Sequence, residues 1–250
     1  MQVSVKSTSM IVVGFVSLCL LSGCLGNRNW QYPPSSSGTY LNEKAVNPVK
    51  GNAIVLPLED LRGNAVKQEY WKATIPLVPY GDTQYQRPET AENPEQVDVV
   101  KFDPSHDFSK AVAAELANAG IFSSVKFSED ASQHSADVVF RGRLRSTDWK
   151  RRLYTYLLGP VGVVFWIVGL PMSETTTGLE MELRLTPASE PEKVLWSMTM
   201  DFEGKRLDGP YYGLEAAVES YPQAIQEALR PAIADLVNLA NKDPHRLMPR

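Results

Sequence analysis

The sequence is poor in cysteine. Its 250 residues include two, Cys19 and Cys24, and none follows them. The chain after residue 24 therefore cannot form an internal disulfide, a thiolate metal site or a catalytic thiol, all of which need cysteine side chains. Any fold built from that part of the chain must be held together by packing and hydrogen bonds.

The sequence also lacks an excess of basic residues and the common catalytic motifs. Its formal net charge is −4, whereas nucleic-acid binding needs a basic surface. The histidines, His106, His134 and His245, lie far apart without metal-ligand spacing, and no nucleophile elbow, phosphate loop or dinucleotide-binding turn is present. We predict no catalytic residue, no cofactor, no metal and no nucleic-acid partner; an enzyme would need a histidine or acidic cluster assembled by the fold.

The N-terminus has the pattern of a secretory signal peptide. Lys6 stands in a short polar lead, and the apolar run 10–21 ends in small residues. This run rises about 18 Å as a helix, which is too short to cross a bilayer of about 30 Å. We therefore predict a cleaved signal peptide over residues 1–23.

The end of that segment, Leu21-Ser22-Gly23-Cys24, resembles the lipobox of bacterial lipoproteins. The resemblance implies a mature protein that begins at Cys24, whose thiol accepts diacylglycerol, and whose acyl chains (palmitate among them) anchor it stably to a membrane. Leu25 follows the cysteine in place of Asp, as in lipoproteins released to the outer membrane. The resemblance thus implies an outer-membrane lipoprotein that faces the periplasm.

Composition divides the mature chain into a tether and one domain. Residues 24–50 are rich in Gly, Asn, Ser and Pro, which predicts a flexible tether. We predict a single domain over residues 51–250. Within it, residues 60–96 are polar and contain several prolines, and we expect an irregular insert there.

Two helices are indicated by apolar residues at helical spacing. The first follows Asp107, which can cap it, and stops at Gly120. The second covers about 221–241, and Pro231 should kink or split it. Short apolar or alternating runs predict strands at 53–58, 96–102, 121–127, 136–144, 179–185 and 193–202. This order predicts an α/β (α+β) fold with a mixed β-sheet and two main helices.

Two of these segments carry a family resemblance. Residues 113–125 and 136–142 place a helix ending in Gly, a Phe-x-x-Val strand and an Ala-Asp-apolar strand start in succession. This pattern is similar to periplasmic lipoproteins with a TolB-N-terminal-like domain, a group that includes penicillin-binding-protein activators and curli-secretion-type lipoproteins. The resemblance implies the fold and the compartment, and no reaction.

The apolar segment 153–172 contains no charged residue and follows Lys150, Arg151 and Arg152. Its length suffices to cross a membrane, but glycines and Pro160 interrupt it. A single crossing would also place strands of one domain in two compartments, which argues against it.

Two interpretations of this segment stay open. In the first it is an interfacial loop, helix or hairpin that contacts lipid or a protein partner through Tyr154, Tyr156, Phe165 and Trp166, with the three basic residues near anionic phospholipids. In the second it is a buried helix or hairpin that covers one face of the sheet.

These patterns favour a non-catalytic binding or assembly module for a machine of the cell envelope. Its partners would be the membrane, through the acyl chains on Cys24, and an envelope protein. The alternative is a homo-oligomeric secretion or pore subunit that inserts residues 153–172 into the membrane.

Overall fold

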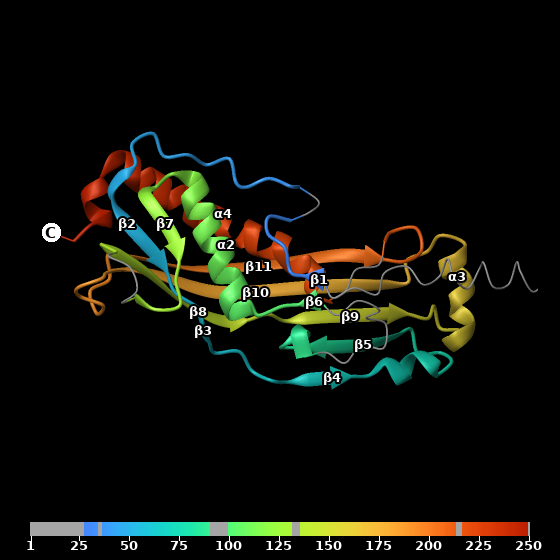
Figure 1. The fold of residues 1–250 in the computed structure, drawn as a ribbon. Coiled ribbons are helices and arrows are strands. Elements are labelled where there is room, and N and C mark those ends of the chain that lie inside the picture. Colours follow the sequence, from blue (N-terminus) through green and yellow to red (C-terminus); the bar gives the residue numbers. More distant parts are fainter. Residues whose placement is uncertain (1–27, 35–36, 91–99, 132–135, 214–216, 250) are drawn as a thin grey trace, which may run out of the picture.

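The computed structural model describes residues 28–34, 37–90, 100–131, 136–213 and 217–249. The predicted signal peptide and Cys24 lie outside these residues. The fold class is confirmed: the described chain forms a mixed nine-stranded sheet with two long helices, α2 (Pro104–Ala119) and α4 (Tyr221–Lys242), and the short helix α3 (Val163–Ile167) (Figure 1).

The sheet is built around the long strand β10 (Ser173–Pro187). Strand β11 (Trp196–Asp208) pairs with it antiparallel along one edge, as the alternating pattern of residues 179–185 predicts. The other edge of β10 is shared by β8 (Val138–Ser146) and then β9 (Trp149–Tyr154). This sharing divides the sheet into two halves along its length.

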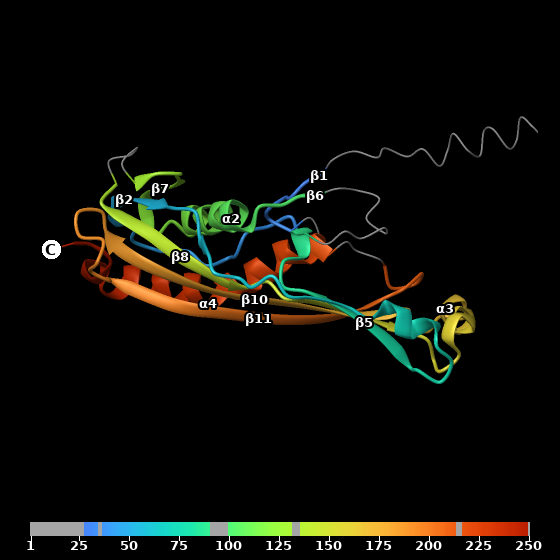
Figure 2. The same ribbon diagram turned by 90° about the horizontal axis from the view of Figure 1, so that it is seen from below.

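The first half of the sheet carries the helices. Strands β2 (Val49–Val55) and β7 (Phe122–Phe127) continue it beyond β8 in parallel, and the short β3 (Glu59–Asp60) also pairs with β8. Helices α2 and α4 pack against one face of this half (Figures 1 and 2).

The second half, called the tip half below, continues beyond β9 with two further strands. They are β5 (Tyr80–Tyr85) and β4 (Val66–Gln68), both antiparallel to their neighbours. Helix α3 lies at the far end of this half (Figure 2). A separate small ladder joins β1 (Arg28–Asn29) to β6 (Val100–Lys101).

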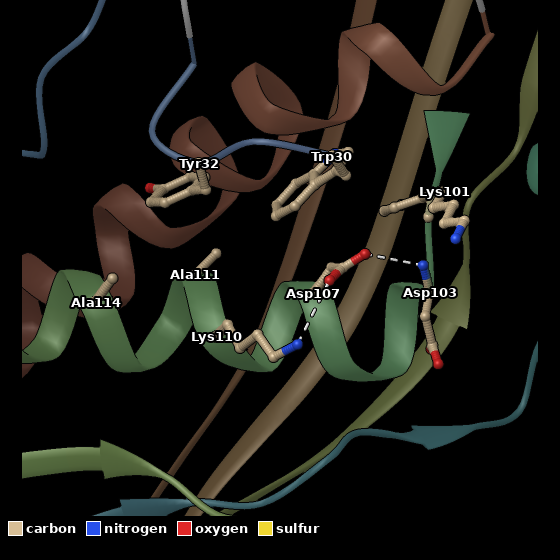
Figure 3. A pocket seen from close by; sticks show the side chains of 9 residues that line it. Trp30, Tyr32, Lys101, Asp103, Asp107, Lys110, Ala111 and Ala114 are labelled. Atoms are coloured by element: carbon tan, nitrogen blue, oxygen red, sulfur yellow. Dashed lines mark hydrogen bonds and ion pairs between the residues drawn. The ribbon is translucent and has the colours of Figure 1, made fainter. Parts of the chain in front are cut away.

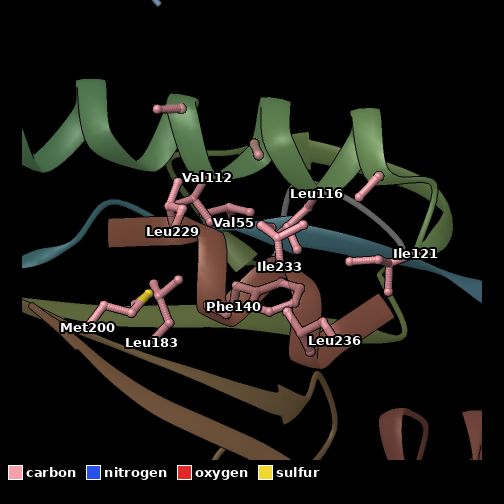
Figure 4. Close-up of a cluster of buried hydrophobic side chains, with 14 of the residues drawn as sticks. Val55, Val112, Leu116, Ile121, Phe140, Leu183, Met200, Leu229, Ile233 and Leu236 are labelled. Atoms are coloured by element: carbon pink, nitrogen blue, oxygen red, sulfur yellow. The ribbon is translucent and has the colours of Figure 1, made fainter. Parts of the chain in front are cut away.

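The main core lies between the two long helices and the first half of the sheet (Figure 4). It is formed by fully buried aliphatic and aromatic side chains, each of which stabilises the fold by about 1.5–3 kcal/mol. They include Val55, Val112, Leu116, Ile121, Phe140, Leu183, Met200, Leu229, Ile233 and Leu236.

Helix α2 ends as predicted and begins differently. Gly120 closes it in the left-handed conformation with φ 66°, which glycine adopts without a steric cost. The predicted cap at Asp107 is wrong, because the side chain of Asp103 accepts the backbone N–H of His106. Asp107 instead accepts the backbone N–H of Asp103 at 2.8 Å, so that the two carboxylates together satisfy the helix start.

Helix α4 runs unbroken through Pro231, so the predicted split does not occur. Pro231 lies on the exposed side of the helix. Water can therefore satisfy the carbonyl that loses its partner there, and the apolar face stays continuous against the sheet.

The part of the predicted tether that the structure describes packs against the domain. Residues 30–34 and 37–49, called the N-terminal strap below, lie along α2 and α4. Leu41 is buried, and the Trp30 ring stacks on Phe102 at 5.6 Å. The carboxylate of Glu115 accepts the Leu41 N–H at 3.0 Å and the Tyr32 O–H. The strap has few apolar residues, but these hydrogen bonds to Glu115 complete its packing against the helices.

The predicted irregular insert also differs from the structure. Residues 66–68 and 80–85 are strands, joined by a 3-10 turn, Tyr70–Thr74, and a second turn covers Pro88–Thr90. The reason is long-range pairing with β9, which local composition does not show. Of the strand predicted over 96–102, the structure describes Val100–Lys101 as β6, and residues 91–99 lie outside the described residues.

Candidate functional site

The apolar segment 153–172 lies at the free end of the tip half and faces solvent. Val161, Ile167 and Val168 are 62%, 63% and 69% exposed, so the interpretation as buried core does not hold for them. In the described chain, no helix has the length and apolar character that a membrane crossing would require.

Two other loops complete this end of the molecule. The Leu77 N–H donates to the Leu157 carbonyl at 2.8 Å, and the hydroxyls of Tyr211 and Tyr212 donate to the carbonyls of Ile167 and Gly169. We call residues 70–80, 155–172 and 209–213 together the apolar tip. The first and third of these loops were not predicted to be part of the site.

The apolar tip concentrates the exposed hydrophobic side chains of the protein. Of the 20 large hydrophobic residues that are exposed in the described chain, 14 belong to the tip. They are Trp71, Ile75, Leu77, Tyr80, Leu157, Leu158, Val161, Val163, Val164, Ile167, Val168, Leu170, Tyr211 and Tyr212. Contiguous exposed apolar surface of this kind marks an interaction site.

Backbone strain is concentrated in the same place. Among the described residues, three non-glycine residues have positive φ: Leu77 at 68°, Tyr156 at 54° and Leu157 at 69°. The left-handed conformation costs a bulky residue about 1–2 kcal/mol. Strain of this kind persists where the surroundings impose it and clusters at functional sites.

The predicted contact aromatics form the inner scaffold of the tip. Tyr154, Tyr156, Phe165 and Trp166 are all half-buried. The Tyr156 and Phe165 rings lie 5.0 Å apart, and the Trp166 Nε1–H donates to the Tyr154 carbonyl at 3.0 Å. These aromatics shape the loop, and the outermost side chains are aliphatic.

The predicted basic residues lie on β9, directly behind the tip, and point to opposite faces. Arg152 pairs with Asp82 at 3.0 Å and stacks over the Tyr80 ring at 4.2 Å, and Lys150 lies 3.6 Å from the same carboxylate. Arg151 is buried, 3.6 Å from Asp208. Lys150 and Arg152 are therefore the two that can reach a surface in contact with the tip.

The Asp82 carboxylate stays charged at neutral pH. Burial acts to raise its pKa, but the hydrogen bond from Arg152 and the charges of Arg152 and Lys150 more than offset this and hold the pKa below its ordinary value. The result is a charged collar immediately behind the tip, whose one charged residue, Lys72, is paired with Glu69 at 2.9 Å.

A hollow of about 810 Å³ beside the start of α2 is the second candidate (Figure 3). Trp30, Tyr32 and Phe102 form its aromatic part. Burial raises the pKa of Asp107 there, and the Lys110 Nζ lies 3.9 Å from its carboxylate. Asp107 already serves the helix start, and the lining residues offer no nucleophile paired with a base.

A metal centre is not assembled in the described part of the chain. Within those residues, no three His, Cys, Asp or Glu side chains are placed together so as to hold an ion.

The comparisons with known proteins give no family. No protein-family profile and no curated protein matches the chain.

Among solved structures, a Xanthomonas campestris protein described by the family name DUF330 is 13% identical, covers 80% of this chain and 91% of its own, and has a TM-score of 0.39. Two PelC dodecamers from Paraburkholderia phytofirmans are also similar, one of them a variant. The variant is 17% identical over 78% of this chain and 96% of its own, with a TM-score of 0.36. The other is 16% identical over 78% and 92%, with a TM-score of 0.33. TM-scores of 0.33 to 0.39 are too low to support an inference about function. The resemblance to TolB-N-terminal-like lipoproteins stays a prediction.

Proposed function

We propose that this chain is a non-catalytic binding module of the cell envelope, anchored by acyl chains on Cys24, with the apolar tip as its binding surface. The observation that carries the proposal is the concentration of exposed apolar side chains on the three loops of the tip. In and next to these loops, residues 73–81, 153–172 and 209–213 contain no charged residue.

The exposed apolar side chains and the strained backbone of the tip both lower the stability of the protein. Each large aliphatic side chain left in water forgoes about 1.5–3 kcal/mol relative to burial. The tip exposes many such side chains and holds three residues in a strained conformation, although its loops are tied together by hydrogen bonds. A surface that is both costly and well ordered is explained if another surface covers it.

The experiment is site-specific photocrosslinking in intact cells. A photoreactive residue at Ile167 or Leu77 should give tip-dependent adducts with an envelope component. The same residue at Thr199, which is exposed on β11 away from the tip, serves as the matched control. Identical adducts from tip and control positions, or none under several conditions, would contradict the proposal.

A second candidate, an oligomeric secretion or pore subunit, is favoured by one observation. In the described chain, β11 pairs with β10 alone, so its outer edge is open over 13 residues. An open edge can pair with another chain, but the exposed charges of Asp201, Glu203 and Lys205 oppose this, and the candidate therefore ranks second. Light scattering across concentrations tests it, because a strict monomer excludes it.

A further inference from the structure

The outermost part of the tip has almost no hydrogen-bonding capacity in its side chains. From Leu157 to Leu170 the sequence contains one side-chain nitrogen, Trp166 Nε1, and no side-chain oxygen. That nitrogen already donates to the Tyr154 carbonyl at 3.0 Å. Protein interfaces carry about one hydrogen bond per 100–200 Å² and are enriched in arginine, so this surface is poorly suited to a protein partner.

Several backbone donors of the same segment are satisfied by nearby carbonyls. The N–H groups of Leu158, Val161, Val168, Gly169 and Leu170 donate to carbonyls three to five residues earlier, at 2.9–3.3 Å. Lipid hydrocarbon offers no hydrogen-bond partner, so a backbone that enters it must be satisfied internally. These five donors around α3 meet this condition.

The strand register behind the tip orders the side chains by polarity. Tyr80 pairs with Tyr154 at the strand ends, and Asp82 pairs with Arg152 two residues further back. Two strand residues span about 7 Å. The order from the end of the molecule is therefore aliphatic, tyrosine, then charged, which is the order of hydrocarbon, interface and headgroup in a bilayer.

The anchor keeps lipid within reach of the tip. Three residues separate Cys24 from Arg28, so Cys24 lies at most about 14 Å from the start of β1. A second membrane is out of reach on so short a link. The bilayer that holds the acyl chains is thus present near the tip at a high effective concentration.

From these observations we propose that the apolar tip inserts into the hydrocarbon of one leaflet of the membrane that holds Cys24. Tyr80 and Tyr154 lie at the interface, and Lys150 and Arg152 lie among the headgroups. The proposal rests on the proposed function, since it names the surface that the binding module covers. Insertion by about 5–10 Å suffices to bury the aliphatic side chains.

The test uses residues 24–250 with Cys24→Ser, a chain that keeps every described residue and contains no other cysteine. Single cysteines at Ile167, Tyr80 and Thr199 carry an environment-sensitive fluorophore. With phosphatidylcholine vesicles we expect a blue shift at Ile167, deep quenching by spin labels on the acyl chain, shallower quenching at Tyr80, and no change at Thr199. Phosphatidylglycerol should strengthen binding without being required.

The matched variants place a charge on or away from the tip. Ile167→Asp combined with Val168→Asp should lower vesicle partitioning by at least about tenfold, as expected from the lost burial of two aliphatic side chains. Val194→Asp, at a residue 48% exposed outside the tip, should leave it unchanged. Circular dichroism confirms that both variants are folded.

The outcomes separate this inference from the proposed function. A folded parent without a spectral shift at Ile167 overturns lipid insertion, and tip-specific crosslinks to a protein would then still support the binding module. Binding that requires phosphatidylglycerol, is abolished by salt and shows no acyl-chain quenching also overturns it, in favour of an electrostatic surface contact. Absence of both vesicle binding and tip crosslinks contradicts both proposals.

Discussion

Glu115 is a carboxylate with 0% exposure in the C-terminal half of α2, and its partners are donors on other elements. It accepts hydrogen bonds from the Tyr32 hydroxyl, the Leu41 N–H at 3.0 Å and the Gln226 side chain at 3.3 Å. Burial, reinforced by the hydrogen bond to Glu115, raises the pKa of Tyr32, so the phenol keeps the proton that it donates. One side chain thus joins the N-terminal strap to both long helices.

We predict that Glu115→Ala lowers the free energy of unfolding by on the order of 2–3 kcal/mol, because it leaves buried donors without an acceptor. Glu115→Gln should cost less, since its amide oxygen can replace one acceptor. Urea denaturation measures both. Glu227→Ala, at a half-exposed carboxylate on α4, is the control and should change stability by less than about 0.5 kcal/mol. Equal effects at the two positions would show that Glu115 does not hold the strap.

The lowered pKa of Glu182 on β10 should make the stability of the protein depend on pH. The hydrogen bond from Arg184 at 2.5 Å is the main cause that lowers its pKa; burial opposes it, and Arg145 at 2.9 Å adds to it. Because the folded pKa lies below the unfolded one, the ionised carboxylate stabilises the native state above the ordinary glutamate pKa of about 4.3. That contribution is lost as the pH falls through the folded pKa.

Glu182→Gln should therefore reduce stability at pH 7 and flatten its decline below about pH 4.3. Urea midpoints measured from pH 7 downward give the two slopes. Glu203→Gln, whose side chain is 64% exposed, is the comparison and should follow the parent. Parallel slopes for the parent and Glu182→Gln would refute the assignment.

At the scale of elements, Arg62 attaches the tip half to the first half. Its side chain is 2% exposed, and it bonds the carboxylate of Asp60 at 2.9 Å, that of Glu89 at 2.6 Å and the Thr147 hydroxyl at 2.6 Å. Thr147 lies at the junction of β8 and β9. A single guanidinium therefore fixes both ends of the segment that contains β4 and β5.

Arg62→Leu should destabilise the protein by about 3–5 kcal/mol, because two carboxylates would lose their buried partner. Hydrogen exchange should show β4 and β5 losing protection while α2 and α4 keep theirs. Arg87→Leu, which removes a 27%-exposed partner of Asp60 at 2.8 Å, should have a smaller effect. Loss of protection that is uniform over the chain would mean that the tip half does not open separately.

The elements that sequence patterns predicted correctly are those whose signal is local. Helical spacing located α2 and α4, and alternation located the β10–β11 hairpin. The strands of the insert were missed because β5 exists through its pairing with β9, about 70 residues away along the chain. The docked strap was missed for the same kind of reason, since its main acceptor, Glu115, lies far along the sequence.

The candidate site was found in part. The absence of charge over residues 153–172 indicated the segment. Residues 73–81 and 209–213 are also uncharged, but so is the longer run 29–42, so this signal does not single out the two companion loops. Exposure was not predictable, because an apolar run is equally compatible with a core. Arg151 and Arg152 have different roles because successive side chains of a strand point to opposite faces. This could be predicted only if β9 were already known to be a strand.

At the scale of the whole molecule, the apolar tip and the C-terminus lie at opposite ends of an elongated body (Figures 1 and 2). The strap begins between them. Trp30 stacks on Phe102, Phe102 stacks on Tyr221, and the Tyr221 hydroxyl donates to the Thr147 carbonyl at 2.6 Å. The strap therefore begins at the level of the β8–β9 junction, and the residues from Thr147 to Tyr154, which include β9, extend about 23 Å from there to the tip.

This geometry predicts that a lipidated molecule lies inclined to its membrane. The link from Cys24 to Arg28 spans at most about 14 Å. The distance from the start of the strap to the tip is longer, about 23 Å. Both can reach one bilayer only if the long axis tilts toward it. The C-terminal end of α4 should then stay near the lipid surface, although it lies at the end opposite the tip.

The length of the link between Cys24 and β1 tests this orientation. A fluorophore on Lys242→Cys, near the C-terminal end of α4, reports its distance from an acceptor dye in the bilayer. Insertion of about 20 Gly and Ser residues after Asn27 would add roughly 25 Å of reach and allow the body to stand upright on its tip, so energy transfer should fall. The same fluorophore on Ile167→Cys should show no change, because the tip stays inserted in both proteins. Unchanged energy transfer at Lys242 would mean either that the strap has left the helices or that the link does not set the tilt. Glu115→Ala distinguishes the two, because it lowers energy transfer at Lys242 only if the docked strap holds the body close to the membrane.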